Sequence, residues 1–223
     1  MLGPAEWGAV MTKFPKRLFD EPDADPDTLA HLGPLRGLAG TWQSQKGDDD
    51  KPTAEGGEHQ VFVEHIDLQP IDPQTNGPQL LYGLRYHTHI VKPGEVETYH
   101  DQVGYWLWEP ATGRILFSLT IPRGQIVLAE GMATPNATSF TVTAKRGSTE
   151  NGICSGPFLE ENFRTEAFSV TVTLNGDGSW SYQETTTLAI KGVEKPFEHT
   201  DQNRMVLVAP PRPNPLMAAK VTS

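Results

Sequence analysis

The sequence predicts an all-β protein: a closed antiparallel up-and-down barrel of about ten strands, with one short helix near the N-terminus. Between residues 80 and 131, apolar or alternating runs end one after another at Pro/Gly turns, which is typical of a strand meander. Similar runs with short connections precede and follow this stretch. A long antiparallel meander closes on itself because closure removes unpaired edges, and a barrel of about ten strands leaves a lumen wide enough for a ligand.

Composition narrows the classes of partner and compartment. The chain has 223 residues, a formal net charge of −10 and a single cysteine. Such a chain offers no basic surface to neutralise phosphates, so we expect no nucleic acid and no membrane as partners. There is neither an apolar run of membrane-spanning length nor a charged leader region. A lone cysteine favours a reducing compartment, and we expect a cytoplasmic protein.

Three parts are expected along the chain. Residues 1–27 mix isolated hydrophobic residues with prolines and an acidic cluster, which predicts an N-terminal arm that is partly disordered. Residues 28–208 carry the strand pattern of the ligand-binding barrel. Residues 209–223 form a proline-rich C-terminal tail, for which we expect no packing.

The barrel domain is expected to open with the short helix and two strands. The helix is predicted over residues 28–36, with Asp27 or Thr28 as its N-cap and a break near Gly33. The first strand starts at the segment LAGTW, and residues 58–68 alternate as a second strand.

An acidic run, GDDDKPTAEGG at residues 47–57, separates these two strands. Three adjacent aspartates suggest calcium, but the run lacks the spacing that places oxygens around the ion in an EF-hand. We therefore expect a solvated acidic loop.

The first hairpin of the meander gathers polar side chains. If Pro93 and Gly94 occupy the centre of the turn, Lys92 pairs with Glu95, and the strands continue in that register. Because side chains alternate along a strand, one face of the hairpin is then mainly apolar and the other polar. The residues predicted to share the polar face are Arg85, His87, His89, Thr98, His100 and Gln102.

This polar face has three interpretations. An HxH pair with a third histidine on the neighbouring strand, here His87, His89 and His100, is a spacing from which β-sheet enzymes build zinc or iron sites. Arg85 and Gln102 could instead grip a ligand carboxylate by charge-assisted hydrogen bonds. The face could also be a solvated surface or line a wet lumen, and the sequence does not decide whether it points into the barrel or out of it. No nucleophile motif indicates hydrolytic catalysis.

Two families resemble this chain. The segment GTW at residues 40–42, with Arg204 in the last strand, resembles the calycin superfamily of lipocalins and fatty-acid-binding proteins, in which the tryptophan lies beneath a basic residue. A closer resemblance, over about residues 29–208, is to the nitrobindin family of heme-binding β-barrels. The segments that carry it are LAGTW, Pro52-Thr53 followed by Glu58, HDQVGY, IPRG followed by AEG, SYQETTTLAIKG, and His199.

The nitrobindin resemblance implies a heme b site. It implies that His199 ligates the iron axially and that Thr53 lies against the heme, with Glu198 or Asp201 near enough in sequence to orient the imidazole. With ferric heme, the resemblance implies chemistry with nitric oxide and a peroxynitrite isomerase-like activity. The chain departs from the family's GxWxGxG motif, because Ser44 and Lys46 replace glycines.

The expected function is therefore a small-molecule-binding β-barrel of the nitrobindin type. The alternatives are a heme-free carrier of a fatty acid or another hydrophobic or amphipathic ligand, gripped by Arg85 and its neighbours, and a three-histidine metal site. The oligomeric state is left open, a homodimer included.

Overall fold

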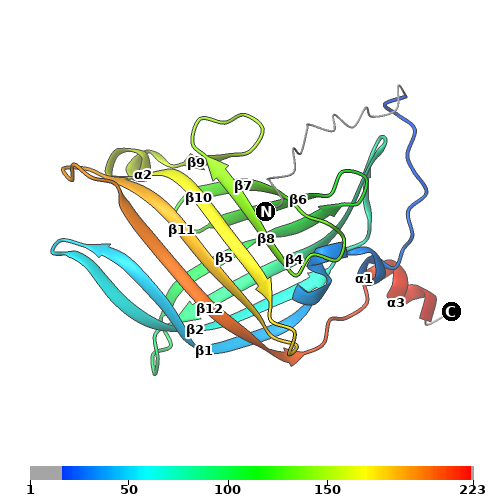
Figure 1. Cartoon of the computed structure of the whole chain (residues 1–223), viewed down its shortest axis with the longest axis horizontal. Coiled ribbons are helices and arrows are strands. Elements are labelled where there is room, and N and C mark those ends of the chain that lie inside the picture. Colours follow the sequence, from blue (N-terminus) through cyan, green and yellow to red (C-terminus); the bar gives the residue numbers. More distant parts are fainter. Residues whose placement is uncertain (1–16, 222–223) are drawn as a thin grey trace, which may run out of the picture.

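Ten antiparallel strands form a closed barrel in the computed structural model, which describes residues 17–221 (Figure 1). Pairing of β2 with β4 and of β1 with β12 closes the ring. In ring order the strands are β1 (Gly40–Thr53), β2 (Gly56–Pro70), β4 (Gln79–Val91), β5 (Thr98–Glu109), β6 (Arg114–Ile121), β7 (Gln125–Met132), β8 (Ser139–Lys145), β10 (Phe163–Leu174), β11 (Trp180–Ile190) and β12 (Phe197–Ala209). The short strands β3 (Gln74–Asn76) and β9 (Gly152–Ser155) pair outside the ring with β4 and β7. The predicted fold class is confirmed.

The predicted N-terminal helix is present as two pieces. Asp27 caps α1 (Thr28–His31) by accepting a hydrogen bond from the Ala30 amide. The α-helix breaks where Gly33 adopts a φ of 55°, a left-handed conformation that suits glycine, and η1 (Gly33–Leu38) continues as a 3₁₀ helix. Two further helices, α2 (Pro157–Asn162) and α3 (Pro215–Val221), were not expected. None of the helices in residues 17–221 has the length and apolar character of a membrane span.

The two ends of the barrel differ. At the helix end, η1 buries Leu35 and Leu38 completely, and the Trp42 indole donates to the Leu38 carbonyl at 2.8 Å. These side chains belong to an apolar core that fills this end together with Trp108. At the opposite, hairpin end lie α2 and the connections at 54–55, 92–97, 122–124 and 191–196 (Figure 1). The packing of η1 on this core therefore closes the helix end.

The segments that flank the barrel meet at the helix end. Asn214, which is 1% exposed, donates to the Pro26 carbonyl at 2.8 Å and to Asp72 at 2.7 Å, and accepts from the Thr28 amide. The C-terminal tail thus packs against the barrel, although its composition gave no sign of it. Of the predicted N-terminal arm, residues 17–27 carry neither helix nor strand, and the rest lies outside the described residues.

The acidic run is a strand, so the prediction of a solvated loop is wrong. β1 continues to Thr53, and only residues 54–55 connect it to β2. Alternation along β1 turns Asp48 and Asp50 outward, where both contact His59, at 3.4 and 3.0 Å. Asp49, between them, points inward and is only 3% exposed. The three aspartates therefore divide between the two faces of the barrel wall.

The β4–β5 register also differs from the prediction. The turn at Pro93-Gly94 forms, with the Glu95 amide bonded to the Lys92 carbonyl at 3.0 Å. Pairing resumes only at Val91 and Thr98, and a bulge then leaves Tyr99 without a partner in the ladder. As a result His87 faces Val103, three residues beyond the predicted His100. Because the register is shifted by an odd number of residues, His87 and His100, which were predicted to lie opposite each other, point to opposite faces of the sheet.

The expected contact of Trp42 with Arg204 is absent. Inward positions on β12 fall on odd residue numbers, so Met205 is buried while Arg204 faces outward and pairs with Asp177. Trp42 packs instead edge-on against Trp180, with ring centroids 5.9 Å apart.

Candidate functional site

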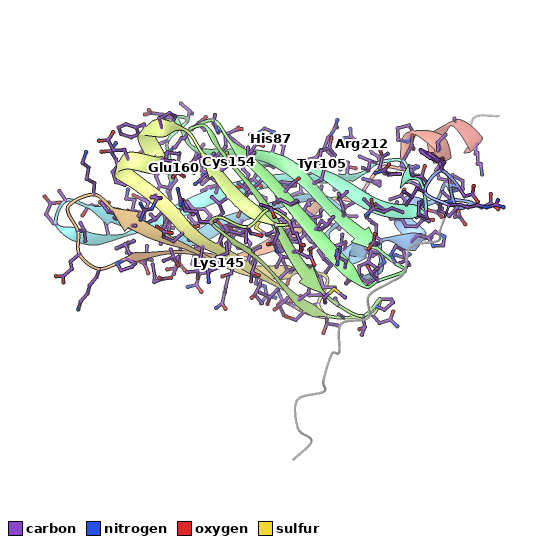
Figure 2. The ribbon with its side chains drawn as sticks, turned by 90° about the horizontal axis from the view of Figure 1, so that it is seen from above. His87, Tyr105, Lys145, Cys154, Glu160 and Arg212 are labelled. Carbon is purple, nitrogen blue, oxygen red and sulfur yellow. The ribbon has the colours of Figure 1, made fainter. Side chains whose placement is uncertain are left out.

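The barrel wall separates the predicted histidine cluster. His87 lies on the outer face (Figure 2), where its Nε2 is 2.9 Å from Asp101. His89 lies on the same face, with its Nε2 3.0 Å from Thr98 Oγ1. Arg85 is exposed on the same outer face, whereas His100 pairs with inward-facing Ile90 and points into the barrel. The prediction that three histidines share one face is therefore wrong, because it rested on the register that the bulge shifts.

His100 and Gln102 belong to an inward chain of hydrogen bonds. His100 Nε2 lies 3.2 Å from Gln102 Oε1, and the Gln102 amide donates to the Tyr86 hydroxyl at 2.7 Å. Tyr86 in turn donates to the Ser118 carbonyl at 3.2 Å. Burial lowers the pKa of His100, and the nearby Arg123 charge acts in the same direction against the Gln102 hydrogen bond. This wall presents a neutral imidazole to the interior.

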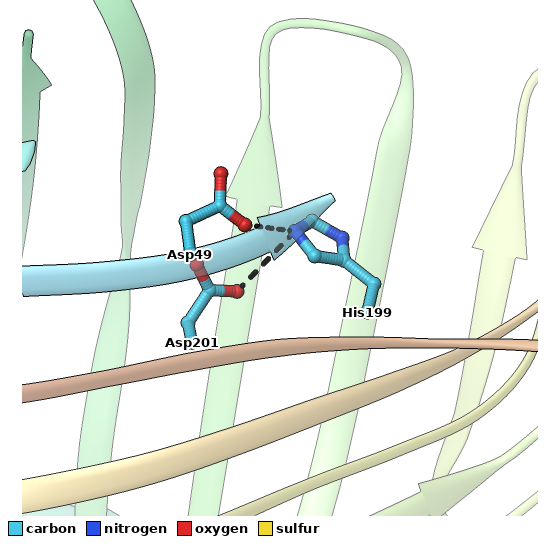
Figure 3. A group of neighbouring side chains, drawn as sticks. All are labelled: Asp49, His199 and Asp201. Carbon is cyan, nitrogen blue, oxygen red and sulfur yellow. Dashed lines mark hydrogen bonds and ion pairs between the residues drawn. The ribbon is translucent and has the colours of Figure 1, made fainter. Parts of the chain in front are cut away.

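Asp49, His199 and Asp201 gather on the inner face in an arrangement that could hold a metal ion (Figure 3). His199 Nε2 is 2.7 Å from Asp49 Oδ1 and 3.6 Å from Asp201 Oδ2. Asp49 on β1 is directly opposite Asp201 on β12, and His199 is two residues before Asp201 on the same face. One ligand atom from each residue lies within 4.8 Å of the others. The strand pairing itself brings these three groups together.

A tyrosine from the far wall completes the group. The bulge in β5 lets Tyr99 reach across the interior and donate its hydroxyl to Asp49 Oδ2, the oxygen that His199 does not use. The Lys51 and Lys92 ammonium groups lie 5.3 and 5.6 Å from the Tyr99 ring centroid, within the range of cation–π attraction.

Two more carboxylates line the interior next to this group. Glu184 on β11 is directly opposite Asp201, so Asp49, Asp201 and Glu184 form a row across three adjacent strands. Glu64, which is 2% exposed, accepts hydrogen bonds from the Tyr182 hydroxyl at 2.9 Å and the Asn203 amide at 2.7 Å. We call Asp49, Glu184, His199 and Asp201 the acidic site.

Burial and mutual repulsion shift the pKa values in the acidic site. Burial raises the pKa of Asp201 to about 8, with the Glu184 charge adding to it, and burial with the charges of Glu64 and Asp49 raises that of Glu184 to about 8. Burial opposes ionisation of Asp49, but hydrogen bonds from His199 and Tyr99 outweigh it and lower the pKa. Burial likewise opposes the imidazolium, yet the Asp49 hydrogen bond and the Asp201 charge raise the pKa of His199. At neutral pH the Asp49 carboxylate therefore pairs with the His199 imidazolium, beside two carboxyl groups that mostly keep their protons.

The other predicted site residues lie apart from the acidic site. Thr53 ends β1, and its hydroxyl donates to the Gly56 carbonyl at 3.2 Å within the hairpin turn. Glu198 faces outward and accepts from Thr187 at 3.1 Å, so of the two candidates to orient His199 only Asp201 does so.

Two hollows lie on the outer wall, one of about 480 Å³ over β1 and β10–β12 and one of about 380 Å³ over β8 and β10–β12. Outward side chains such as Thr171, Gln183 and Thr143 line them, and neither includes Asp49, His199 or Asp201. They are surface grooves of a strongly twisted sheet and separate from the acidic site.

Sequence reasoning missed Asp49, Tyr99 and Glu184. Alternation continued from Trp42 would have placed Asp48 and Asp50 inside, and an irregularity in β1 between Ser44 and Gly47 turns Asp49 inward instead. Glu184 lies within the strictly alternating segment WSYQETTTLAI, on the face of the buried Trp180. No pattern in the sequence indicated the bulge that delivers Tyr99.

Comparison with known proteins yields a family and a fold. A family model described as a THAP4-like, heme-binding β-barrel domain matches residues 31–206. Eleven solved chains match the structure, among them the crystal structure of Rv2717c from M. tuberculosis. That chain is 16% identical, with a TM-score of 0.55, and the alignment covers 85% of this chain and 100% of the other. At this identity the likeness shows the fold alone. The search of curated proteins finds no match.

Proposed function

Because this chain belongs to the family of THAP4-like, heme-binding β-barrel domains, we propose that it is a nitrobindin-type barrel whose guest is recognised by the acidic site. The observation that carries the proposal is the position of that site inside the barrel, near the hairpin end. The side chains of His199 and Asp201 are 30% and 22% exposed, so a guest can reach them. The helix end, by contrast, is filled by η1 and its apolar neighbours. The single cysteine supports a cytoplasmic location.

The carboxyl groups of the acidic site favour a positively charged guest. Asp49, Asp201 and Glu184 present three carboxyl groups to the same region, and a bound cation would stabilise the ionised forms of Asp201 and Glu184. Arg85, which was expected to grip a fatty-acid carboxylate, lies on the outer face. We therefore favour a cationic guest over the fatty-acid carrier.

Heme b does not fit the side chains as they lie. An axial iron would occupy a position next to His199 Nε2, the atom at the tip of the ring. Asp49 Oδ1 already occupies that position at 2.7 Å, with Asp201 Oδ2 at 3.6 Å beside it. Iron ligation by His199 would require both carboxylates to move away. The nitric oxide and peroxynitrite chemistry implied by the nitrobindin resemblance depends on that iron and is not part of the proposal.

Thermal unfolding with a panel of guests tests the proposed function. We expect organic cations such as spermidine to raise the Tm of the purified protein, by roughly 5 °C at a hundredfold excess over Kd, and oleate to leave it unchanged. Glu184→Gln should weaken the stabilisation by cations. The matched control is Glu198→Gln on the outer face, which should behave as wild type. Stabilisation by oleate alone would refute the proposal.

A further inference from the structure

The acidic site has the geometry of a small-cation site. We propose that Asp49, His199 and Asp201 bind one divalent first-row transition-metal ion without a porphyrin, in the class of Zn²⁺ or Mn²⁺. This inference rests on the proposed function and names the kind of cation that the barrel holds. Three potential ligand atoms from two paired strands converge within 4.8 Å, a region suited to a single ion (Figure 3).

The donor set selects the class of metal. One imidazole nitrogen with two carboxylate oxygens suits zinc, manganese and ferrous iron, whereas magnesium and calcium prefer oxygen ligands alone. Three protein ligands also leave a position open for water or a substrate. The outer histidines that the structure describes offer no comparable set. His87 meets the single carboxylate of Asp101 and His89 meets a hydroxyl, while Asp48 and Asp50 lie at different ring nitrogens of His59 and do not converge on one point.

The surroundings hold the ligands in place. Tyr99 donates to Asp49 Oδ2, which leaves Oδ1 directed at the point where the three residues converge. Such hydrogen bonds to the far atom of a ligand are a regular feature of protein metal sites. All three ligands stand on strands of a closed sheet, so little ordering is needed on binding.

The row of carboxylates is the second, independent observation. Like charges directly opposite each other weaken a sheet, yet Asp201 has Asp49 on one side and Glu184 on the other. The Glu184 side chain makes no hydrogen bond or ion pair with any residue in the described part of the chain. A bound divalent cation would allow these carboxyl groups to be ionised together, and Glu184 stands next in the row as a further ligand.

Metal titration of the full-length protein tests the inference. Isothermal titration with ZnCl₂, and visible absorption with Co²⁺ as a spectroscopic probe, should show one ion bound per chain. His199→Gln and Asp201→Asn should each weaken binding by at least tenfold, in line with the typical cost of disturbing a metal site. The matched control is His87→Gln, which removes a histidine from the outer His–Asp pair and should leave the affinity unchanged.

Any other outcome of these titrations would contradict the proposed metal site. Absence of binding, or equal binding by wild type and by both His199→Gln and Asp201→Asn, means that the cluster is an ion pair only. Loss of binding in His87→Gln would assign the metal to the outer histidines. Circular dichroism checks that each variant folds, and Glu184→Gln supplies a further variant outside the three ligands. If spermidine stabilises the protein while Zn²⁺ does not bind, the metal inference fails and the proposed function stands.

Discussion

Tyr99 and Asp49 are hydrogen-bonded across the barrel although their strands, β5 and β1, are not neighbours in the ring. The bond exists because the bulge in β5 turns Tyr99 inward and because the irregularity in β1 between Ser44 and Gly47 turns Asp49 inward. It links β5 to β1 across the interior near the hairpin end. It also fixes the carboxylate that holds His199.

Removing the Tyr99 hydroxyl should destabilise the protein. We expect Tyr99→Phe to lower the free energy of unfolding by about 2 kcal/mol, because the hydrogen bond goes to a charged and buried acceptor. Urea unfolding at neutral pH measures this. Tyr105→Phe is the matched control, since Tyr105 is 42% exposed on the outer face and should change stability by less than about 0.5 kcal/mol. Equal effects in the two variants would contradict the prediction.

Glu64 should make the protein less stable as the pH rises. Burial raises its pKa from the ordinary 4.5 to about 7, against the hydrogen bonds from Asn203 and Tyr182. Between these values the unfolded chain loses the proton while the folded protein keeps it. The free energy of unfolding should therefore fall by about 3 kcal/mol from pH 4.5 to 7, and Glu64 should add no slope below or above that window.

Comparison with Glu64→Gln isolates this contribution. The amide oxygen of glutamine can accept both hydrogen bonds, so the variant should lack this part of the pH slope while remaining folded. The nearby Glu184 also titrates, which is why the difference between the two proteins, and not the wild-type curve alone, is measured. Glu198→Gln on the outer face should follow the wild-type curve. Parallel curves for wild type and Glu64→Gln would show that Glu64 is ionised in the folded state.

Hemin titration should show that the acidic site obstructs iron ligation. We expect wild type to give no Soret shift that depends on His199, because Asp49 and Asp201 engage its Nε2. Replacing both by alanine should free the imidazole, so that a shift appears that His199→Ala then abolishes. A strong shift in wild type that is lost in His199→Ala would instead establish heme binding at His199.

Gly104 allows β5 and β6 to lie close together beneath Tyr86. A Cβ at this position would meet the Ser118 carbonyl oxygen at 1.9 Å and the Tyr86 ring at 3.1 Å. We expect Gly104→Ala to cost about 3 kcal/mol in chemical denaturation, at the upper end for overpacking, because backbone must move. Gly57→Ala is the control, since its Cβ would make only ordinary contacts with Phe197 at 3.6 Å. A neutral Gly104→Ala would contradict this reading of the packing.

The barrel could be predicted because its evidence is local. Alternating runs and Pro/Gly turns define the strands one by one, and closure follows from the need to pair every edge. The break at Gly33 and the Asp27 cap were predictable for the same reason. The register of β4 and β5 was not, because a bulge of one residue leaves no mark in the hydrophobic pattern.

The site was less predictable than the fold, since its members lie far apart in the chain. His199 was found only through the family resemblance, and its partner Asp49 lies 150 residues away. Which aspartate of the acidic run faces inward depends on the irregularity in β1 between Ser44 and Gly47, and nothing in the sequence pattern marks it. Tertiary pairing, which a single sequence does not display, decides both questions.

The hydrogen bonds of Asn214 have a consequence for protein engineering. It joins the segments before and after the barrel at the helix end, on the far side from the acidic site. The flanking segments are thus held together at the helix end, while the hairpin end is built from side chains on separately paired strands. This separation suits protein redesign, because side chains at the hairpin end can be substituted for new guests while the contacts at the helix end keep the scaffold intact.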